Sequence, residues 1–112
     1  MHKYLDIQIT LLFAIVLTSA MLWPLTVPPS TPEGSDKLVH LFAFAALAFP
    51  LGRTGRFGLF PVFLGASVFG GFIEIIQPSF NRGADFNDWV ADSLGALLGI
   101  ACGLTYRRLR QQ

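Results

Sequence analysis

The chain has 112 residues, which is room for one domain over residues 1–112. It is 53% hydrophobic and only 13% charged, about half the charged fraction of an ordinary soluble domain. A soluble domain of this size could not bury the apolar surface that its 11 Phe help to make. The net charge of +1 gives no general attraction to nucleic acid, and the single Cys102 excludes an intrachain disulfide.

Four apolar segments predict an all-α integral membrane protein, a four-helix transmembrane bundle with short loops. They cover approximately residues 7–23, 38–52, 57–76 and 89–106. Each approaches the length that crosses the hydrocarbon core at about 1.5 Å per residue. The first begins like a secretory signal peptide, but Asp6 interrupts its basic start and no good cleavage site follows. We therefore expect it to remain as a helix.

The second segment is the shortest of the four. Its apolar residues cover only about 21 Å at the rise of an α-helix. It can cross if Asp36, Lys37 and Arg53 lie at headgroup depth, or if the bilayer thins locally. The alternative is a hydrophobic hairpin that does not cross, but four crossings make the charges consistent.

The distribution of basic residues predicts the orientation. With the N-terminus in the cytoplasm, the inner segments hold six basic residues and the outer loops hold only Lys37 and Arg82. The inner six are Lys3, Arg53, Arg56, Arg107, Arg108 and Arg110. This asymmetry obeys the positive-inside rule, so both termini are expected in the cytoplasm of a bacterium, with the protein in the inner membrane.

The connections between segments differ in character. Residues 24–36 hold four prolines and predict an extended outer loop, with Ser35 or Asp36 as the N-cap of the second helix. Residues 52–56 predict a tight turn that makes the second and third helices antiparallel neighbours. Residues 77–87 form a second, polar outer loop, and the basic tail is expected to contact anionic lipids.

Two helices carry polar and small residues on a shared face. In the fourth helix, Asp88 and Asp92 align with a run of glycines spaced four residues apart. Such spacing permits close approach between helices, so this face should point into the bundle. In the third helix, Glu74 shares a face with two more glycines. The helix-packing glycines are therefore expected to be Gly70, Gly71, Gly95, Gly99 and Gly103.

These faces and the start of the second helix place a polar cluster at the outer end of the bundle. Its expected members are Asp36, Lys37, His40, Glu74, Gln77, Arg82, Asp85, Asp88 and Asp92. Ionisable residues at membrane depth are costly and normally face a partner or a water-filled cavity. The first helix supplies no member of this cluster. The inner halves of the helices are expected to lack ionisable residues, so no polar path should cross the membrane.

The same residues carry a resemblance to the VanZ-like membrane protein family. Residues 36–44 resemble its D-K-x-x-H-x-x-x-F signature, and residues 74–77 resemble its E-x-x-Q element. Arg82, Asp85 and Asp88, followed by Gly95, resemble its closing elements, in the same order and spacing. Asp92 departs from the family, which more often has Asn there. The resemblance implies a multi-pass inner-membrane protein, and it links the chain to glycopeptide resistance and lipid-linked envelope work, without supplying a reaction.

Three functions follow as hypotheses. The cluster could bind membrane lipids, in particular an envelope lipid or a lipid-linked precursor, through Lys37, His40 and Arg82. The surrounding acids would equally suit an amine or a hydroxyl-bearing headgroup. A second hypothesis is a small accessory subunit that packs its Phe-rich faces on a larger membrane protein complex, with the polar network serving only to fix the packing.

The third hypothesis is a lipid-directed acid/base enzyme, with His40 beside Glu74 and Asp88. No nucleophile is evident, because Ser67 lies too deep and Ser93 turns away from the acidic face. Only one histidine lies in the cluster, so neither a metal nor any other cofactor is expected.

Overall fold

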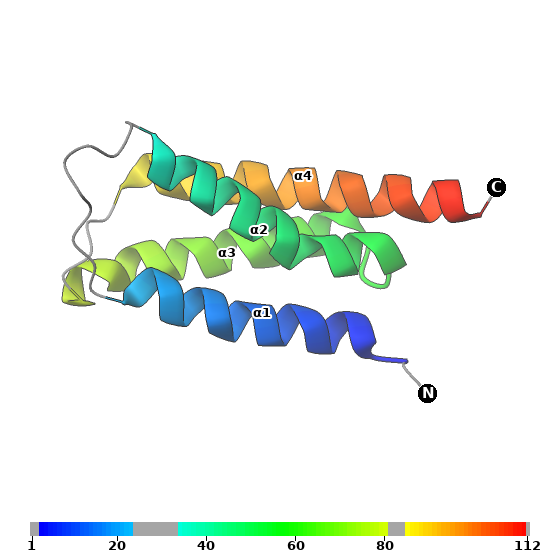
Figure 1. Cartoon of the computed structure of the whole chain (residues 1–112), viewed down its shortest axis with the longest axis horizontal. Coiled ribbons are helices and arrows are strands. Elements are labelled where there is room, and N and C mark those ends of the chain that lie inside the picture. Colours follow the sequence, from blue (N-terminus) through cyan, green and yellow to red (C-terminus); the bar gives the residue numbers. More distant parts are fainter. Residues whose placement is uncertain (1–2, 24–33, 81–84, 112) are drawn as a thin grey trace.

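The fold is a bundle of long α-helices, seen in the computed structural model in Figure 1, which describes residues 3–23, 34–80 and 85–111. The helices are α1 (Leu5–Leu22), α2 (Ser35–Thr54), α3 (Leu59–Ile76) and α4 (Phe86–Arg110), with a short 3₁₀ helix η1 (Gln77–Phe80) after α3. No strand occurs in the described ranges. Each long helix is long and apolar enough to cross a membrane, so the predicted four-helix, multi-pass architecture is confirmed.

Successive helices run in opposite directions along a body of 48 × 25 × 21 Å. The two ends of the chain therefore lie together at one end of the bundle, which we call the terminal end (Figure 1). The opposite end, which we call the loop end, holds the starts of α2 and α4 and the end of α3.

The closest helix pair is α2 with α4. A Cβ built on Gly95 would collide with the Leu41 carbonyl oxygen, and one on Gly99 would collide with that of Ala45. Gly103 lies in the same way against the backbone at Phe49. These three glycines let two backbones touch. The tight turn does join α2 to α3, but α2 packs far more extensively against α4 than against α3.

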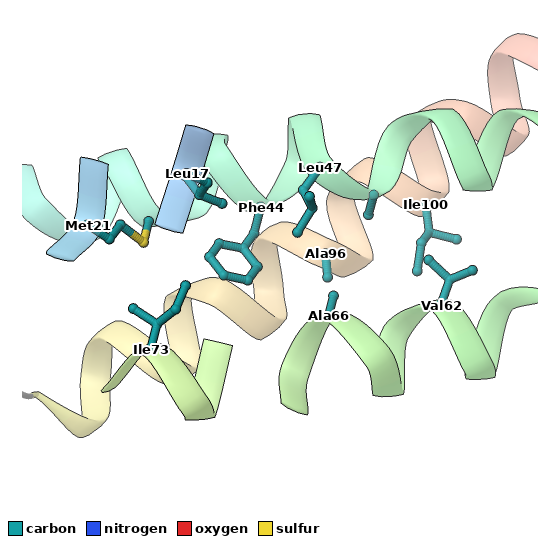
Figure 2. Packing of buried hydrophobic residues seen from close by; sticks show 10 residues of the cluster. Leu17, Met21, Phe44, Leu47, Val62, Ala66, Ile73, Ala96 and Ile100 are labelled. Carbon is teal, nitrogen blue, oxygen red and sulfur yellow. The ribbon is translucent and has the colours of Figure 1, made fainter. Parts of the chain in front are cut away.

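The apolar core lies between these helices (Figure 2). Phe44 of α2 is fully buried, and its ring centroid is 5.8 Å from that of Phe69 on α3. The buried apolar set is Leu17, Met21, Phe44, Leu47, Ala48, Val62, Ala66, Ile73, Ala96 and Ile100. Small side chains fill the α2–α4 contact, and the large apolar side chains on the outer faces remain exposed, as expected where lipid covers a bundle.

Polar residues extend two helices beyond their apolar segments. α2 begins at Ser35 and ends at Thr54, so its 20 residues reach about 30 Å, although its apolar stretch stays as short as expected because the added residues are polar. Its N-cap is Gly34, at φ +85°, and not Ser35 or Asp36 as predicted. The turn to α3 correspondingly falls after Thr54, where Gly55 at φ +67° ends the helix.

The fourth helix is longer at both ends than residues 89–106. Asp85 starts it, since its side chain accepts a hydrogen bond from the Asn87 amide. It continues to Arg110 because arginines in a last turn complement the helix dipole. The remaining bounds differ from prediction by two residues or fewer, at Leu5 and Leu22 of α1 and at Leu59 of α3. Of the proline-rich loop expected at residues 24–36, positions 24–33 lie outside the described residues.

Candidate functional site

The outer part of the loop-end cluster is centred on the Lys37 ammonium group. Its Nζ atom donates to Asp85 Oδ2 at 2.9 Å, to Asp88 Oδ1 at 3.4 Å and to Asp36 Oδ2 at 3.4 Å. Lys37 thus ties the first turn of α2 to the start of α4. The hydrogen bond from Lys37, followed by that from the Asn87 amide, lowers the pKa of Asp85.

The inner part of the cluster is a buried histidine between two acids. His40 Nδ1 lies 2.6 Å from Asp92 Oδ1, and its Nε2 lies 3.8 Å from Asp88 Oδ2. His40 is 4% exposed and Asp92 is 0% exposed. Since the partners lie on α2 and α4, the close backbone contact made by the glycines brings these side chains within reach. His40 and Asp92 form the deepest contact of the cluster.

The third helix closes the cluster from the other side. Glu74 Oε2 accepts a hydrogen bond of 2.9 Å from the Asp85 amide. Gln77, 1% exposed, donates through Nε2 to the Met21 carbonyl at 3.1 Å. The first helix therefore supplies a backbone acceptor to this end of the bundle, although no side chain of the cluster comes from it.

Three buried oxygens of the cluster accept no hydrogen bond from the described part of the chain. They are Glu74 Oε1, Gln77 Oε1 and Asp92 Oδ2. A buried acceptor left without a donor costs about 1–3 kcal/mol. A network that only fixed the packing would be expected to satisfy such groups. The cluster therefore has acceptor capacity to offer to a ligand.

The two predicted glycines of α3 have different surroundings. A Cβ on Gly70 would lie 2.7 Å from Asp92 Oδ2, so Gly70 makes room for the buried acid. Gly71 faces the indole of Trp89, whose Nε1 donates to the Ser67 carbonyl at 2.9 Å. Both glycines were predicted only as helix-packing residues, but Gly70 also borders the site.

The donor set also has the composition of a metal site. One ligand atom each of His40, Glu74 and Asp92 lies within 4.8 Å of the others, and Asp36, Asp85 and Asp88 form a second such group. Imidazole with carboxylates suits divalent first-row metals. A site of His40 with Glu74, Asp88 and Asp92 is possible in ligand type from the sequence too, but a single histidine made a metal unexpected, and the convergence of Glu74 and Asp92 on His40 does not by itself decide the question.

The serines that lacked a clear role are paired. Ser67 Oγ of α3 lies 3.0 Å from Ser93 Oγ of α4. Ser93 faces away from Asp92 as expected, but it turns toward α3 and not toward lipid. Their hydroxyl groups bind each other between α3 and α4, and neither is hydrogen bonded to His40.

Sequence reasoning missed a second polar contact, at the terminal end. Asp6 is buried in the first turn of α1, where its carboxylate accepts from Thr54 Oγ1 at 2.6 Å and from Arg56 Nε at 3.0 Å. Arg56 also donates to the Lys3 carbonyl, and its hydrogen bond to Asp6 raises its pKa. The expectation that this half of the bundle lacks ionisable residues was wrong. The sequence feature that could have predicted this contact is Asp6 itself, an acid directly before an apolar segment.

The structure thus links seven of the nine expected cluster residues by contacts, while Gln77 is buried nearby but bonds the Met21 carbonyl and Arg82 lies outside the described residues. Chemically, the cluster can accept hydrogen bonds, hold a cation, or exchange a proton at His40. No family model, curated protein or solved structure matches this chain.

Proposed function

We propose that this chain is a VanZ-like protein of the bacterial inner membrane that binds the headgroup of an envelope lipid or lipid-linked precursor. The order and spacing of Asp36, Lys37, His40, Glu74 and Gln77 support the family assignment. The positive-inside rule supports an orientation with the terminal end in the cytoplasm and the loop end outside.

The observation that carries the proposal is the pair of unsatisfied carboxylate oxygens beside His40. Glu74 Oε1 and Asp92 Oδ2 are buried and accept no hydrogen bond from the described residues. A ligand that presents N–H or O–H groups at this point would satisfy both.

The charge of the cluster favours a donor-bearing headgroup over a bare phosphate. Five acids, set against Lys37 and His40, dominate the described part of the cluster: Asp36, Glu74, Asp85, Asp88 and Asp92. Repulsion from these carboxylates would weaken an anion site. A primary amine or a sugar hydroxyl, by contrast, donates hydrogen bonds to carboxylates and is not repelled by them.

Two phospholipids that differ in their N–H donors test this proposal. Phosphatidylethanolamine carries an ammonium group with three donors, and phosphatidylcholine with the same acyl chains has none. We expect native mass spectrometry of the purified protein to show phosphatidylethanolamine bound about tenfold more tightly, the equivalent of one hydrogen bond to a charged group.

Two variants and a control locate the effect. Glu74→Gln and Asp92→Asn should each reduce the preference for phosphatidylethanolamine about tenfold. Ser19→Ala is the matched control, because that hydroxyl is exposed and bonds only the Ile15 carbonyl of its own helix. If both carboxylate variants bound the two lipids as the wild type does, the binding site would be rejected.

The His40–Asp92 contact favours one second candidate, an acid/base enzyme acting on a lipid. A carboxylate on Nδ1 fixes the imidazole and leaves Nε2 to exchange a proton. Hydrolysis products that form from added phospholipid and vanish in His40→Asn would support this activity. The accessory-subunit alternative predicts instead that a larger membrane protein co-purifies in fixed proportion, regardless of Glu74.

A further inference from the structure

The terminal end of the bundle carries two adjoining hollows, a large one and a small one. A groove of about 1050 Å³ runs between α1, α2 and α4 and is lined mainly by apolar side chains, among them Phe42, Ala46, Phe49, Leu98 and Cys102. A smaller hollow of about 240 Å³ is lined by Arg107 and Arg110. The two adjoin, because Arg53, Thr54 and Tyr106 line both.

The arginines that line the small hollow are not neutralised by acids of the described residues. Within the described ranges, Arg53, Arg107 and Arg110 form no ion pair, whereas Arg56 is neutralised by Asp6. The guanidinium carbons of Arg53 and Arg110 lie 5.3 Å and 6.0 Å from the Tyr106 ring centroid. Stacking on one ring orders these side chains while their N–H donors remain available.

The third arginine is also positioned by the fold. A Cβ on Gly55 would fall on the Arg107 guanidinium group, so Arg107 lies directly over the turn between α2 and α3. The absence of a side chain at Gly55 therefore leaves space for this cation beside Arg53. Three positive groups converge where the apolar groove reaches the end of the bundle.

We propose that these two hollows together bind one anionic phospholipid of the bilayer. The phosphate lies among Arg53, Arg107 and Arg110, which present the planar donor groups that suit it. An acyl chain lies in the groove along Phe42, Phe49 and Leu98. The positive charge of the arginines and the apolar groove that adjoins them favour an amphipathic anion. This site is independent of the proposed function, because it lies at the opposite end of the bundle and has the opposite charge.

Phosphatidylglycerol and phosphatidylcholine with identical acyl chains are the probes. We expect native mass spectrometry of the full chain in mild detergent to show at least about tenfold tighter binding of phosphatidylglycerol. Since a basic residue near a membrane surface contributes about fivefold to anionic-lipid affinity, Arg107→Gln should weaken phosphatidylglycerol binding about fivefold.

Arg108→Gln is the matched control. It removes the same charge from the neighbouring position of α4, but Arg108 lines neither hollow. Its binding of phosphatidylglycerol should stay within about twofold of the wild type. Equal weakening by Arg107→Gln and Arg108→Gln would mean a diffuse basic patch and would overturn the site. If Arg107→Gln failed to fold, Arg110→Gln at the helix end provides the same comparison.

Two further measurements test the acyl-chain part. Cys102→Trp fills the groove and should weaken phosphatidylglycerol binding severalfold without changing any charge. Inorganic phosphate at millimolar concentration should not displace the lipid, since it occupies only the small hollow. Displacement by phosphate, or unchanged binding by Cys102→Trp, would show an anion site without an acyl-chain groove and would contradict the proposal.

Discussion

The Lys37 ammonium group touches three carboxylates that belong to different parts of the chain. Two of them, Asp85 and Asp88, lie 48 and 51 residues away. Removing Lys37 would leave these carboxylates close together without a cation. The single positive charge of Lys37 therefore stabilises the arrangement in which the starts of α2 and α4 lie side by side at the loop end.

The lowered pKa of Asp85 predicts a pH dependence of stability. A carboxyl group whose pKa falls on folding stabilises the protein above its unfolded pKa, about 3.9, and loses that contribution as pH falls through the folded value. Asp85→Asn removes the charge but keeps the N-cap oxygen. Thermal unfolding in detergent should show wild type more stable than Asp85→Asn at pH 7, with the difference shrinking below about pH 4. A difference that stayed constant with pH would contradict this prediction.

Sequence reasoning could identify the members of the cluster but not their pairs. Helical periodicity places Asp88 and Asp92 on one face, and that follows from spacing alone. That His40 contacts Asp92 directly depends on the rotation of α2 against α4, which periodicity does not fix. Asp6 was missed for a related reason, because its partner Arg56 lies in a turn 50 residues later.

Glycines decide the arrangement of the helices. The spacing of Gly95, Gly99 and Gly103 predicted a close helix contact, but it could not name α2 as the partner. The tight turn favoured α3 as the neighbour of α2, since short connections join adjacent helices. Backbone contact at the glycines outweighs that local preference, because it buries more of α2 against α4.

A pair of glycine substitutions tests this contact. A Cβ on Gly99 would collide with the Ala45 carbonyl, so Gly99→Ala should lower the free energy of unfolding by about 1–3 kcal/mol. Gly65→Ala is the control, because nothing lies within 4 Å of a Cβ there, and it should raise stability by up to about 1 kcal/mol. Unfolding of both variants in detergent gives the comparison. Similar values for both would mean that the close contact contributes little.

The two ends of the bundle differ in charge. The loop end is rich in acids, and the terminal end holds the unpaired arginines together with Asp6 and Arg56. The positive-inside rule uses this asymmetry to predict the orientation. Because successive helices are antiparallel, both termini lie at the same, arginine-rich end of the bundle (Figure 1).

Reporter fusions test the proposed orientation. Green fluorescent protein fused to either terminus should fluoresce in cells, because it folds in the cytoplasm. Alkaline phosphatase inserted between residues 24 and 33 should be active, because it needs an oxidising compartment. An active phosphatase at either terminus would reverse the orientation and place the polar cluster in the cytoplasm.

The Asp6–Arg56 pair also sets an order of events during synthesis. Asp6 emerges from the ribosome 50 residues before its partner, a delay of about 3–10 s at ordinary translation rates. His40 emerges 52 residues before Asp92 and waits about as long. Asp6 therefore meets its partner as soon as the turn after α2 has been made, whereas His40 lacks its partner until α4 is synthesised. The pair at the terminal end can thus form before α3 and α4 exist, whereas the cluster at the loop end can form only after α4 has been made.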